Sequence, residues 1–567
     1  MKKSIAYLLL IGAIQLQAQD ERTSSFDNTS RNVISGTDLK LIPANKIRLE
    51  PEVPQSEMPK FRLDFSTPSY TWNTKKSLMA VKPDIIKEDS KDSIYLSNYL
   101  RLGGGNNGHL LGELYLSNRP SALWSYNLSA LHLQGNTPIN NQMGAQTRIH
   151  MGGSRYFDNA SLSTELYYHR DHQTYYAQDD SMTNEGKAGV IYDLASAGKT
   201  AENYGIHIDY LFLEKRNVPE VRWLNNVQVF QTNALQEELE AQSTLKFLSR
   251  NKRFALFGDL AFTYLDFTTR KGTLNQNRAN QMFIDFLPRI QFFHKPTKLD
   301  VQVGVNLTYN QHSQIDAPPV RVNPYVSLEK GLADLEMTVY GGIDGGLRKN
   351  SLRRMHEIMP FYGLDLPVEN SFEQINGYIG LKGKISSNSL FHIDFGGNSI
   401  ANQMMFTSHP NDSSHLKDYN GLNALNVVYN DISTIYFRAG AEYLVGEKWK
   451  VSGDIKIVNF GSDNEVWHMP SMQYNAALAF RPISSLLIEA GAKGMGRRLN
   501  QVRIEDKLQE TEVAGFTDVF ARIDYRFNGK GRIWIQGSNL LGKKYENWYG
   551  YPVWGLTVMG GISIGLF

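Results

Sequence analysis

Hydrophobic and polar residues alternate with a period of two along most of the chain after about residue 95. Between residues 301 and 309, Val301, Val303 and Val305 alternate with polar or small residues. A period of two is typical of a half-buried β-strand, because successive side chains point to opposite faces. Residues 449–457 and 519–527 repeat the pattern, with charged residues on the second face. Each predicted strand therefore has one apolar face and one face that requires water.

The connections between these strands alternate in length. The connections at one end of the predicted strands are short turns, and those at the other end are long polar segments. Outer-membrane barrels have short periplasmic turns and long external loops, whereas a soluble β-sandwich has no reason to keep this parity. The chain is therefore predicted to be an all-β, transmembrane antiparallel β-barrel. The short connectors include 386–388, 446–448, 482–484 and 528–530, and the long ones lie near 170–202, 345–372, 399–431 and 497–515.

With this parity enforced, the pattern gives about 22 strands, the number found in plugged outer-membrane transporters. The predicted strands lie near 95–104, 109–117, 121–134, 142–154, 160–170, 202–214, 222–234, 238–248, 253–268, 279–294, 297–310, 320–329, 334–344, 373–385, 389–399, 432–444, 449–459, 471–481, 485–496, 516–527, 531–541 and 554–567.

The N-terminal residues differ from the barrel in composition. Residues 1–18 carry two lysines and then a short apolar run, which predicts a signal peptide that exports the chain to the cell outer membrane. Residues 19–93 are rich in proline, serine, asparagine and charge, which predicts an extended periplasmic arm. Residues 94–567 form the predicted barrel. The arm is shorter than the roughly 100 residues that a folded lumenal plug needs.

Composition narrows the class of protein further. The mean hydropathy of -0.38 does not argue against a barrel, because lipid-facing and lumen-facing residues cancel in a window average. The absence of cysteine excludes a disulfide framework and a lipoprotein anchor. A formal charge of +2 over 567 residues gives no reason to expect a nucleic-acid partner. The 29 tyrosines and 27 phenylalanines suit the aromatic girdles of a membrane barrel.

The last hundred residues resemble the closing strands of TonB-dependent receptors. Residues 534–546, Trp-Ile-Gln-Gly-Ser-Asn-Leu-Leu-Gly-Lys-Lys-Tyr-Glu, are similar to that family's penultimate strand, and Gly550-Tyr551-Pro552 precedes a final strand ending at Phe567. A narrower resemblance, to plug-less TonB-receptor-like barrels, rests on residues 101–106, 113–115 and 345–361. Two departures are the terminal Phe567, which lies one residue out of the apolar register, and the lack of a clear energy-coupling box. The resemblance implies a receptor-like barrel without the family's TonB-driven mechanism.

Few motifs indicate chemistry. Gly103-Gly104-Gly105-Asn106-Asn107-Gly108 lacks the lysine of a phosphate-binding loop and is predicted to be a turn. His169 and His172 are a conceivable metal pair, and residues 179–185 a conceivable calcium loop, but neither has a complete ligand pattern. His356-Glu357 lacks the second histidine of a zinc protease. The chain is therefore predicted not to be an enzyme and to need no cofactor or metal.

Two functions remain open. The first is a receptor- or porin-like transport pore, whose lumen is filled by the arm, by the loop 345–372 folded inward, or by a partner. The second is a non-transporting scaffold subunit, in which the arm or long loops bind periplasmic or surface lipoproteins. Either protein has the outer-membrane lipid and the barrel-insertion machinery as partners. The candidate lumen-facing residues, which would tune passage, are Lys382, Lys384, Arg522, Asp524 and Arg526.

Overall fold

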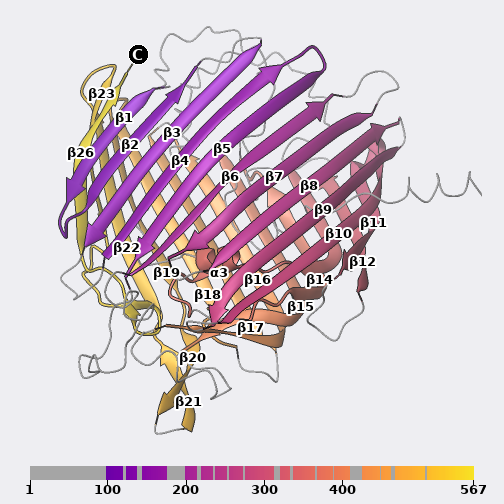
Figure 1. Cartoon of the computed structure of the whole chain (residues 1–567). Coiled ribbons are helices and arrows are strands. Elements are labelled where there is room, and N and C mark those ends of the chain that lie inside the picture. Colours follow the sequence, from indigo (N-terminus) through magenta and orange to yellow (C-terminus); the bar gives the residue numbers. More distant parts are fainter. Residues whose placement is uncertain are drawn as a thin grey trace, which may run out of the picture.

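Twenty-two antiparallel strands follow one another around a closed barrel in the computed structural model of the chain (Figure 1). The barrel closes where β1 (Tyr99–Gly105) pairs with β26 (Thr557–Gly565). The structure describes residues 98–118, 123–136, 143–174, 198–213, 219–233, 236–251, 254–271, 275–311, 319–332, 336–363, 367–386, 388–408, 424–446, 448–461, 466–504 and 507–566. The predicted all-β barrel of 22 strands is confirmed.

Each predicted strand corresponds to one strand of the barrel. The first half contains β2 (Leu110–Ser117), β3 (Trp124–Asn136), β4 (Met143–Tyr156), β5 (Ala160–Gln173), β6 (Lys199–Phe212), β7 (Glu220–Thr232), β8 (Glu237–Arg250), β9 (Phe254–Lys271), β10 (Asn275–His294), a short 3-10 turn (Lys295–Thr297) and β11 (Leu299–Asn310). The second half contains β12 (Val320–Leu332), β13 (Met337–Arg348), β14 (Ser371–Gly383), β15 (Ser389–Thr407), β16 (Asn426–Val445), β17 (Trp449–Phe460), β18 (Met472–Ile483), β19 (Leu486–Met495), β22 (Phe516–Arg526) and β23 (Gly531–Ser538).

The apolar face of the strands points outward. On β11, Val303 and Val305 are 43% and 39% exposed, while the alternating Asn306 is 3% exposed. On β22, Ile523 and Tyr525 are likewise exposed. An outer face of large apolar side chains is stable only in a lipid environment, because water would leave it unburied. The alternation predicted from the sequence therefore separates a lipid-facing side from a polar, water-lined lumen.

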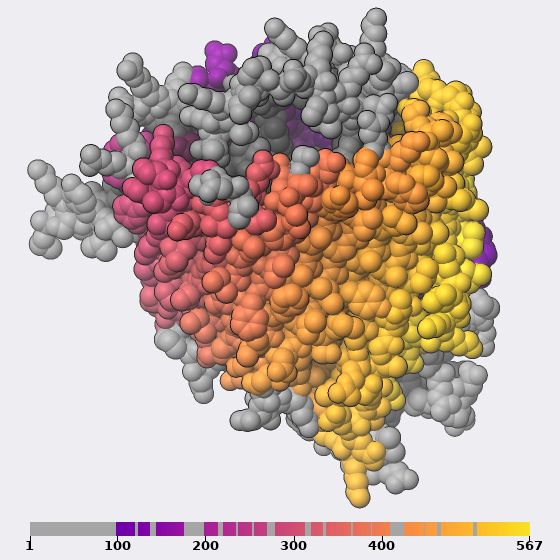
Figure 2. All heavy atoms as spheres, turned by 180° about the vertical axis from the view of Figure 1, so that it is seen from behind, coloured from indigo at the N-terminus to yellow at the C-terminus, as the bar shows by residue number. Residues whose placement is uncertain are grey.

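On the side of the long loops, some strands are longer than predicted and others were not predicted. β15 and β16 extend to Thr407 and start at Asn426, so the predicted loop 399–431 is largely strand at both ends. The predicted loop 497–515 is wrong in its interior: it contains the hairpin of β20 (Arg498–Ile504) and β21 (Lys507–Val513). This hairpin projects beyond the barrel rim (Figures 1 and 2). Two further short strands, β24 (Glu546–Trp548) and β25 (Tyr551–Pro552), lie in the connection before β26.

The glycine-rich segment at the end of β1 is a turn, as predicted. Asn107 and Gly108 have φ values of 54° and 62°, the left-handed conformation that a tight hairpin requires at both central positions. Glycine is also required where β26 approaches β1, because a Cβ atom on Gly561 would lie 1.9 Å from the carbonyl oxygen of Leu102. The predicted signal peptide and periplasmic arm lie outside the described residues. Within the described part, no helix is both long and apolar enough to cross a membrane.

Candidate functional site in the barrel lumen

The long connection between β13 and β14 folds into the barrel, which is one of the three arrangements that the sequence allowed for filling the lumen. We call residues 349–370 the inner loop; its residues 364–366 lie outside the described part. It carries the helix α3 (Leu352–Ile358), which is visible behind the strands of the near wall in Figure 1. Ser351 caps the helix, accepting a hydrogen bond from the backbone N–H of Arg354 at 3.1 Å.

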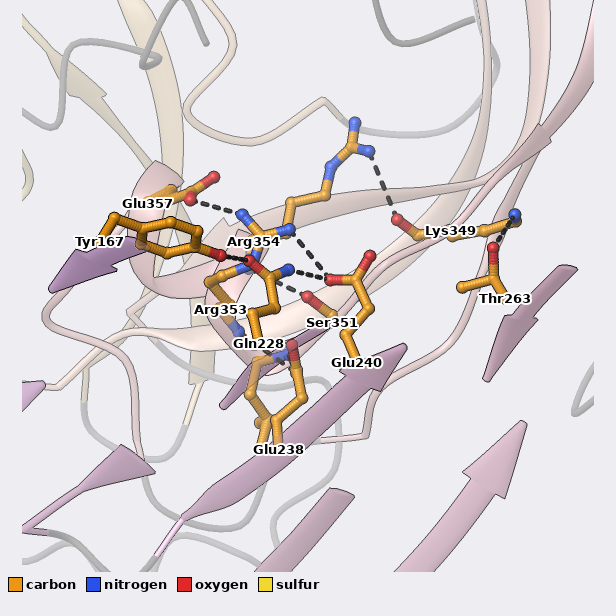
Figure 3. Close-up of polar contacts among 11 residues, drawn as sticks. Tyr167, Gln228, Glu238, Glu240, Thr263, Lys349, Ser351, Arg353, Arg354 and Glu357 are labelled. Carbon is orange, nitrogen blue, oxygen red and sulfur yellow. Dashed lines mark hydrogen bonds and ion pairs between the residues drawn. The ribbon is translucent and has the colours of Figure 1, made fainter. Parts of the chain in front are cut away.

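The guanidinium group of Arg353 is the centre of a buried charge cluster (Figure 3). It contacts Glu357 on the same helix at 2.5 Å and Glu240 of β8 at 3.3 Å. Glu238, also on β8, accepts hydrogen bonds from the backbone N–H groups of Leu352 and Arg353 at 2.5 and 3.3 Å. A buried charge is costly unless it is paired and hydrogen-bonded, so this cluster ties α3 to β8.

A second ion pair holds the start of the inner loop. The Nζ atom of Lys349 lies 2.6 Å from a carboxylate oxygen of Asp285 on β10 and donates to Thr263 of β9 at 3.0 Å. Asp285 is 2% exposed. Further along the chain, Asn370 donates to Gln281 of β10 at 2.6 Å. Both ends of the inner loop are therefore attached to the same wall of the barrel.

The middle of the inner loop contacts strands β5, β6 and β7 of the wall. Lys199 of β6 places its Nζ atom 3.0 Å from the centre of the Tyr362 ring, a cation–π contact. His356 of α3 lies 3.9 Å from Asp171 of β5 and packs beside Phe230 of β7. The side chain of His356 is buried, and burial lowers its pKa well below the usual value. This histidine therefore stays neutral where it packs against the wall.

The inner loop also touches the opposite side of the lumen. Phe361 stacks on Tyr551 of β25 with ring centres 3.9 Å apart. The backbone N–H of Leu425 donates to the carbonyl of Phe361 at 2.9 Å, and the N–H of Gly363 donates to the carbonyl of Leu425 at 3.0 Å. Tyr429 of β16 accepts from the N–H of Glu369 and donates to the carbonyl of Pro367. These contacts make the inner loop a bridge across the lumen on its long-loop side.

Apolar side chains of the inner loop form a packed core with both walls. Met355, Met359 and Tyr362 are each 0% exposed, and Phe361 is 2% exposed. Burying a large apolar side chain contributes about 1.5–3 kcal/mol, so the inner loop packs like the interior of a soluble protein. The residues of this core outside the inner loop are Ala201, Phe230, Leu265, Phe267, Phe283, Leu347, Met404, Phe406, Leu425, Val427, Trp548 and Tyr551.

The connections around the inner loop are packed together as well. The Nδ1 atom of His468 lies 2.7 Å from the carbonyl of Phe406, and its Nε2 atom accepts from the N–H of Tyr549 at 3.3 Å. Arg498, at the base of the β20–β21 hairpin, donates to the carbonyls of Glu546 and Asn547. We call residues 466–470 and 546–551 the external cap. It braces the inner loop from outside the lumen.

The candidate lumen-facing residues lie on or near the inner face of the wall. Lys382 of β14 pairs with Glu329 of β12 at 3.0 Å. Arg522, Asp524 and Arg526 alternate with the outward-facing Ile523 and Tyr525 on β22, and Arg522 pairs with Asp524 at 2.5 Å. Lys384 lies one residue beyond the end of β14, in an exposed ion pair with Glu336 at 3.4 Å. Their role in tuning passage stays a prediction.

The two histidines considered as a metal pair are separated by the strand geometry. β5 continues to Gln173, so His169 and His172 lie on opposite faces of it. His169 instead faces His150 of β4, with their Nε2 atoms 2.7 Å apart, and Glu165 contacts the other nitrogen of His150 at 2.7 Å. The described residues contain no group of three or more potential ligands arranged around a metal. The conceivable calcium loop lies outside the described residues.

Sequence reasoning missed the partners that fix the inner loop. Glu238, Glu240 and Asp285 are ordinary inward positions of their strands, and nothing near them in sequence marks them as partners of residues more than 60 positions away. The helix itself had a signal, since Leu352, Met355 and Met359 follow helical spacing between a serine and a proline. This spacing predicts the helix but does not predict that the helix lies in the lumen.

Comparison with known proteins gives the fold. No protein-family model and no curated protein matches the chain. Solved structures match over most of their length. The FrpB iron transporter from Neisseria meningitidis matches with a TM-score of 0.62 at 10% identity, covering 82% of this chain and 81% of that chain. The siderophore receptor PirA from Acinetobacter baumannii matches with a TM-score of 0.61 at 9% identity, covering 82% and 80%. The copper transporter OprC matches with a TM-score of 0.61 at 10% identity, with the same coverage.

These neighbours share the fold of the barrel as a whole, so the likeness is not confined to the closing strands. Their names describe a siderophore receptor, a copper transporter and an iron transporter. The apolar outer face and this shared fold place the barrel in an outer membrane.

Proposed function

We propose that the chain is a receptor- or transport-type barrel of the outer membrane whose lumen is closed by its own inner loop in place of a TonB-coupled plug. A barrel of 22 strands encloses a lumen wide enough for solutes and must be obstructed to prevent leakage. The observation that supports the proposal is the bridge that the inner loop forms from Glu238 of β8 on one wall to Tyr429 of β16 on the other. The neighbours of the same fold are named as receptors and transporters of iron, siderophores and copper.

The second candidate function is a membrane scaffold that does not transport. The dense packing of the inner loop favours it, because Met355, Met359 and Tyr362 are fully buried and Arg353 is paired on both sides. Opening such a loop would expose an apolar core and leave buried carboxylates without a partner. In this function the arm, residues 19–93, binds periplasmic or surface lipoproteins through its short apolar anchors.

Single-channel conductance in planar bilayers separates the two functions. Four chains are compared: the full chain, a chain lacking residues 20–93, a chain in which a short Gly-Ser linker replaces residues 349–370, and a chain with both changes. If the inner loop closes the lumen, the first two are silent and the last two conduct. If the chain without the arm already conducts, the arm is the plug and the proposal is wrong. Silence of all four supports the scaffold.

A matched control shortens the β20–β21 hairpin by replacing residues 502–509. This hairpin lies on the same side of the barrel but projects away from the lumen (Figure 2). The conductance of the variant with the shortened hairpin is expected to equal that of the full chain. A conducting hairpin variant would mean that any change to the external connections opens the barrel.

A further inference from the structure

Cations on the inner face of the barrel wall are mostly paired with carboxylates on neighbouring strands. Most of these pairs join adjacent strands, and Lys382–Glu329 reaches across β13. They include Arg222–Asp209 at 2.6 Å, Lys246–Asp259 at 3.8 Å, Lys382–Glu329 at 3.0 Å, Arg438–Asp394 at 2.6 Å and Lys493–Asp518 at 3.6 Å. Three other inward cations lie over aromatic rings instead: Arg289 over Phe257 and Tyr325, Arg321 over Phe372 and Lys456 over Tyr436. Two neighbouring cations with neither kind of partner are therefore exceptional in the described wall.

In the described wall, two arginines on the neighbouring strands β22 and β23 have no such carboxylate partner. Arg526 and Arg532 lie directly opposite each other in the antiparallel pairing, and both point away from the outward-facing Tyr525 and Ile533. Like charges in directly opposed positions destabilise a sheet. The charge of Asp524 attracts Arg532, whereas those of Arg526, Arg522 and Arg481 repel it. With Arg101 of β1, which interacts with Arg522, these residues form what we call the arginine patch: Arg101, Arg481, Arg522, Arg526 and Arg532.

Three carboxylates lie beside the arginine patch: Asp524, Glu113 and Glu489, which is directly opposite Arg522. Asp524 pairs with Arg522 at 2.5 Å. Glu113 pairs with Arg101 at 3.7 Å and accepts a hydrogen bond from the hydroxyl of Tyr99 at 2.5 Å. Within the described residues, neither Arg526 nor Arg532 forms an ion pair with a carboxylate. The patch therefore has positive charge in excess of its local partners.

The patch lies at the periplasmic mouth of the lumen. Arg526 directly precedes, and Arg532 closely follows, the short turn 527–530, and short turns mark the periplasmic side. Both chain ends of the barrel meet there, because the N–H of Gly565 donates to the carbonyl of Lys530 and the N–H of Leu566 donates to the carbonyl of Asn98.

We propose that the arginine patch is a binding site for an oxyanion, a phosphate or carboxylate group, at the periplasmic mouth of the barrel. The planar guanidinium fork matches both groups with two parallel hydrogen bonds. Charge of one sign on the wall of a lumen also concentrates the field and attracts counter-ions. A bound oxyanion would relieve the repulsion that the opposed Arg526 and Arg532 otherwise leave in the sheet. The site does not depend on whether the barrel transports.

The oxyanion has two sources with the same chemistry. One is a small free anion of the periplasm. The other is the chain itself, because Asp84, Glu88, Asp89 and Asp92 outnumber Lys87 and Lys91 in the segment that precedes β1. β1 starts at the same mouth, and Asp92 precedes Asn98 by six residues, a reach of at most about 20 Å. A tethered carboxylate would act at a high effective concentration.

Isothermal titration with inorganic pyrophosphate tests the site in the full chain and in the chain lacking residues 20–93. The double variant Arg526→Gln/Arg532→Gln is expected to bind at least tenfold more weakly than its parent. Arg526→Lys keeps the positive charge but loses the planar guanidinium fork. Its affinity for pyrophosphate is expected to lie between those of the parent and the double variant. Lys384→Gln is the matched control, since Lys384 lies at the same rim with its own carboxylate partner. Its affinity is expected to be unchanged.

Each result decides the proposal. Binding to both parent chains that the double variant loses supports a free anion as ligand, and binding only after removal of residues 20–93 supports the chain's own acidic segment. If neither parent binds pyrophosphate, or the double variant binds as tightly as its parent, the proposal is wrong. Folding is checked by thermal unfolding without anion, where loss of the repulsion is expected to raise the midpoint of the double variant. Pyrophosphate is expected to raise the midpoint of the binding parent alone.

Discussion

At the residue scale, the guanidinium of Arg353 carries the attachment of α3. The variant Arg353→Met leaves the buried Glu238 and the partly buried Glu240 and Glu357 around an uncharged side chain. Breaking a buried ion pair from one side costs about 3–5 kcal/mol, so the inner loop is expected to open far more often. Hydrogen exchange of residues 352–358 measures this opening. The control Arg497→Met removes an ion pair with Glu512 that is 71% and 49% exposed, and little effect is expected there. Unchanged exchange of α3 would show that the other contacts of the inner loop hold it without the ion pairs of Arg353.

His468 makes the external cap sensitive to acid. Burial lowers its pKa to about 3, and its two nitrogens are both engaged, with Nε2 accepting from the N–H of Tyr549. A protonated Nε2 cannot accept that hydrogen bond. Because the folded pKa lies below the ordinary value of 6.5, the unfolded cap takes up the proton first. Cap stability is therefore full above pH 6.5 and falls as the pH drops toward 3.

At pH 5 the loss from His468 amounts to about 2 kcal/mol, since each pH unit below the unfolded pKa contributes about 1.4 kcal/mol. Protection factors for exchange of residues 546–551, measured at pH 7 and pH 5, are expected to fall accordingly. The variant His468→Gln stays neutral at both values, so its cap should show a much smaller difference. An equal pH response in the variant would assign the effect to another group.

At the element scale, closure of the barrel depends on the glycines between β1 and β26. In Gly561→Ala the new Cβ would meet the backbone carbonyl of Leu102, which no rotamer change can relieve. Overpacking of this kind costs about 1–3 kcal/mol or more. The heat-modifiable, folded band on denaturing gels is expected to weaken severalfold. Gly555→Ala is the control, because a Cβ there meets nothing within 4 Å. A folded band as strong as the control's would mean that the seam adjusts.

The sequence was sufficient to predict the elements of the wall and insufficient to predict what they enclose. Period two and loop parity identify every strand of the barrel, because each strand has a lipid face and a water face whatever its neighbours are. They underestimate β15, whose last residues, Met404–Thr407, are buried on both faces and so lack the contrast between faces. The β20–β21 hairpin lacks it in the opposite way, since residues 507–510 are exposed on both faces. Glu238 and Asp285 carry no local signal, because their partners come from a distant connection.

At the scale of the whole molecule, the charges of the lumen decide how an opened barrel would conduct. Most wall cations have a carboxylate within ion-pair distance, so their fields largely cancel along the lumen. The arginine patch holds more cations than carboxylates and adds net positive charge at one mouth. A chain whose inner loop is replaced by a linker is therefore expected to conduct with only a modest preference for chloride over potassium.

Reversal potentials in a KCl gradient measure that preference. Adding Arg526→Gln and Arg532→Gln to the loop-replaced chain is expected to bring the chloride-to-potassium permeability ratio close to one, because the remaining wall is paired. Adding Lys384→Gln instead should leave the ratio as it was, since that cation already faces Glu336 in exposed solvent at the rim. A strong cation preference in the loop-replaced chain would mean that the charges of the paired wall do not cancel. The carboxylates rather than the arginines would then dominate the electric field in the lumen.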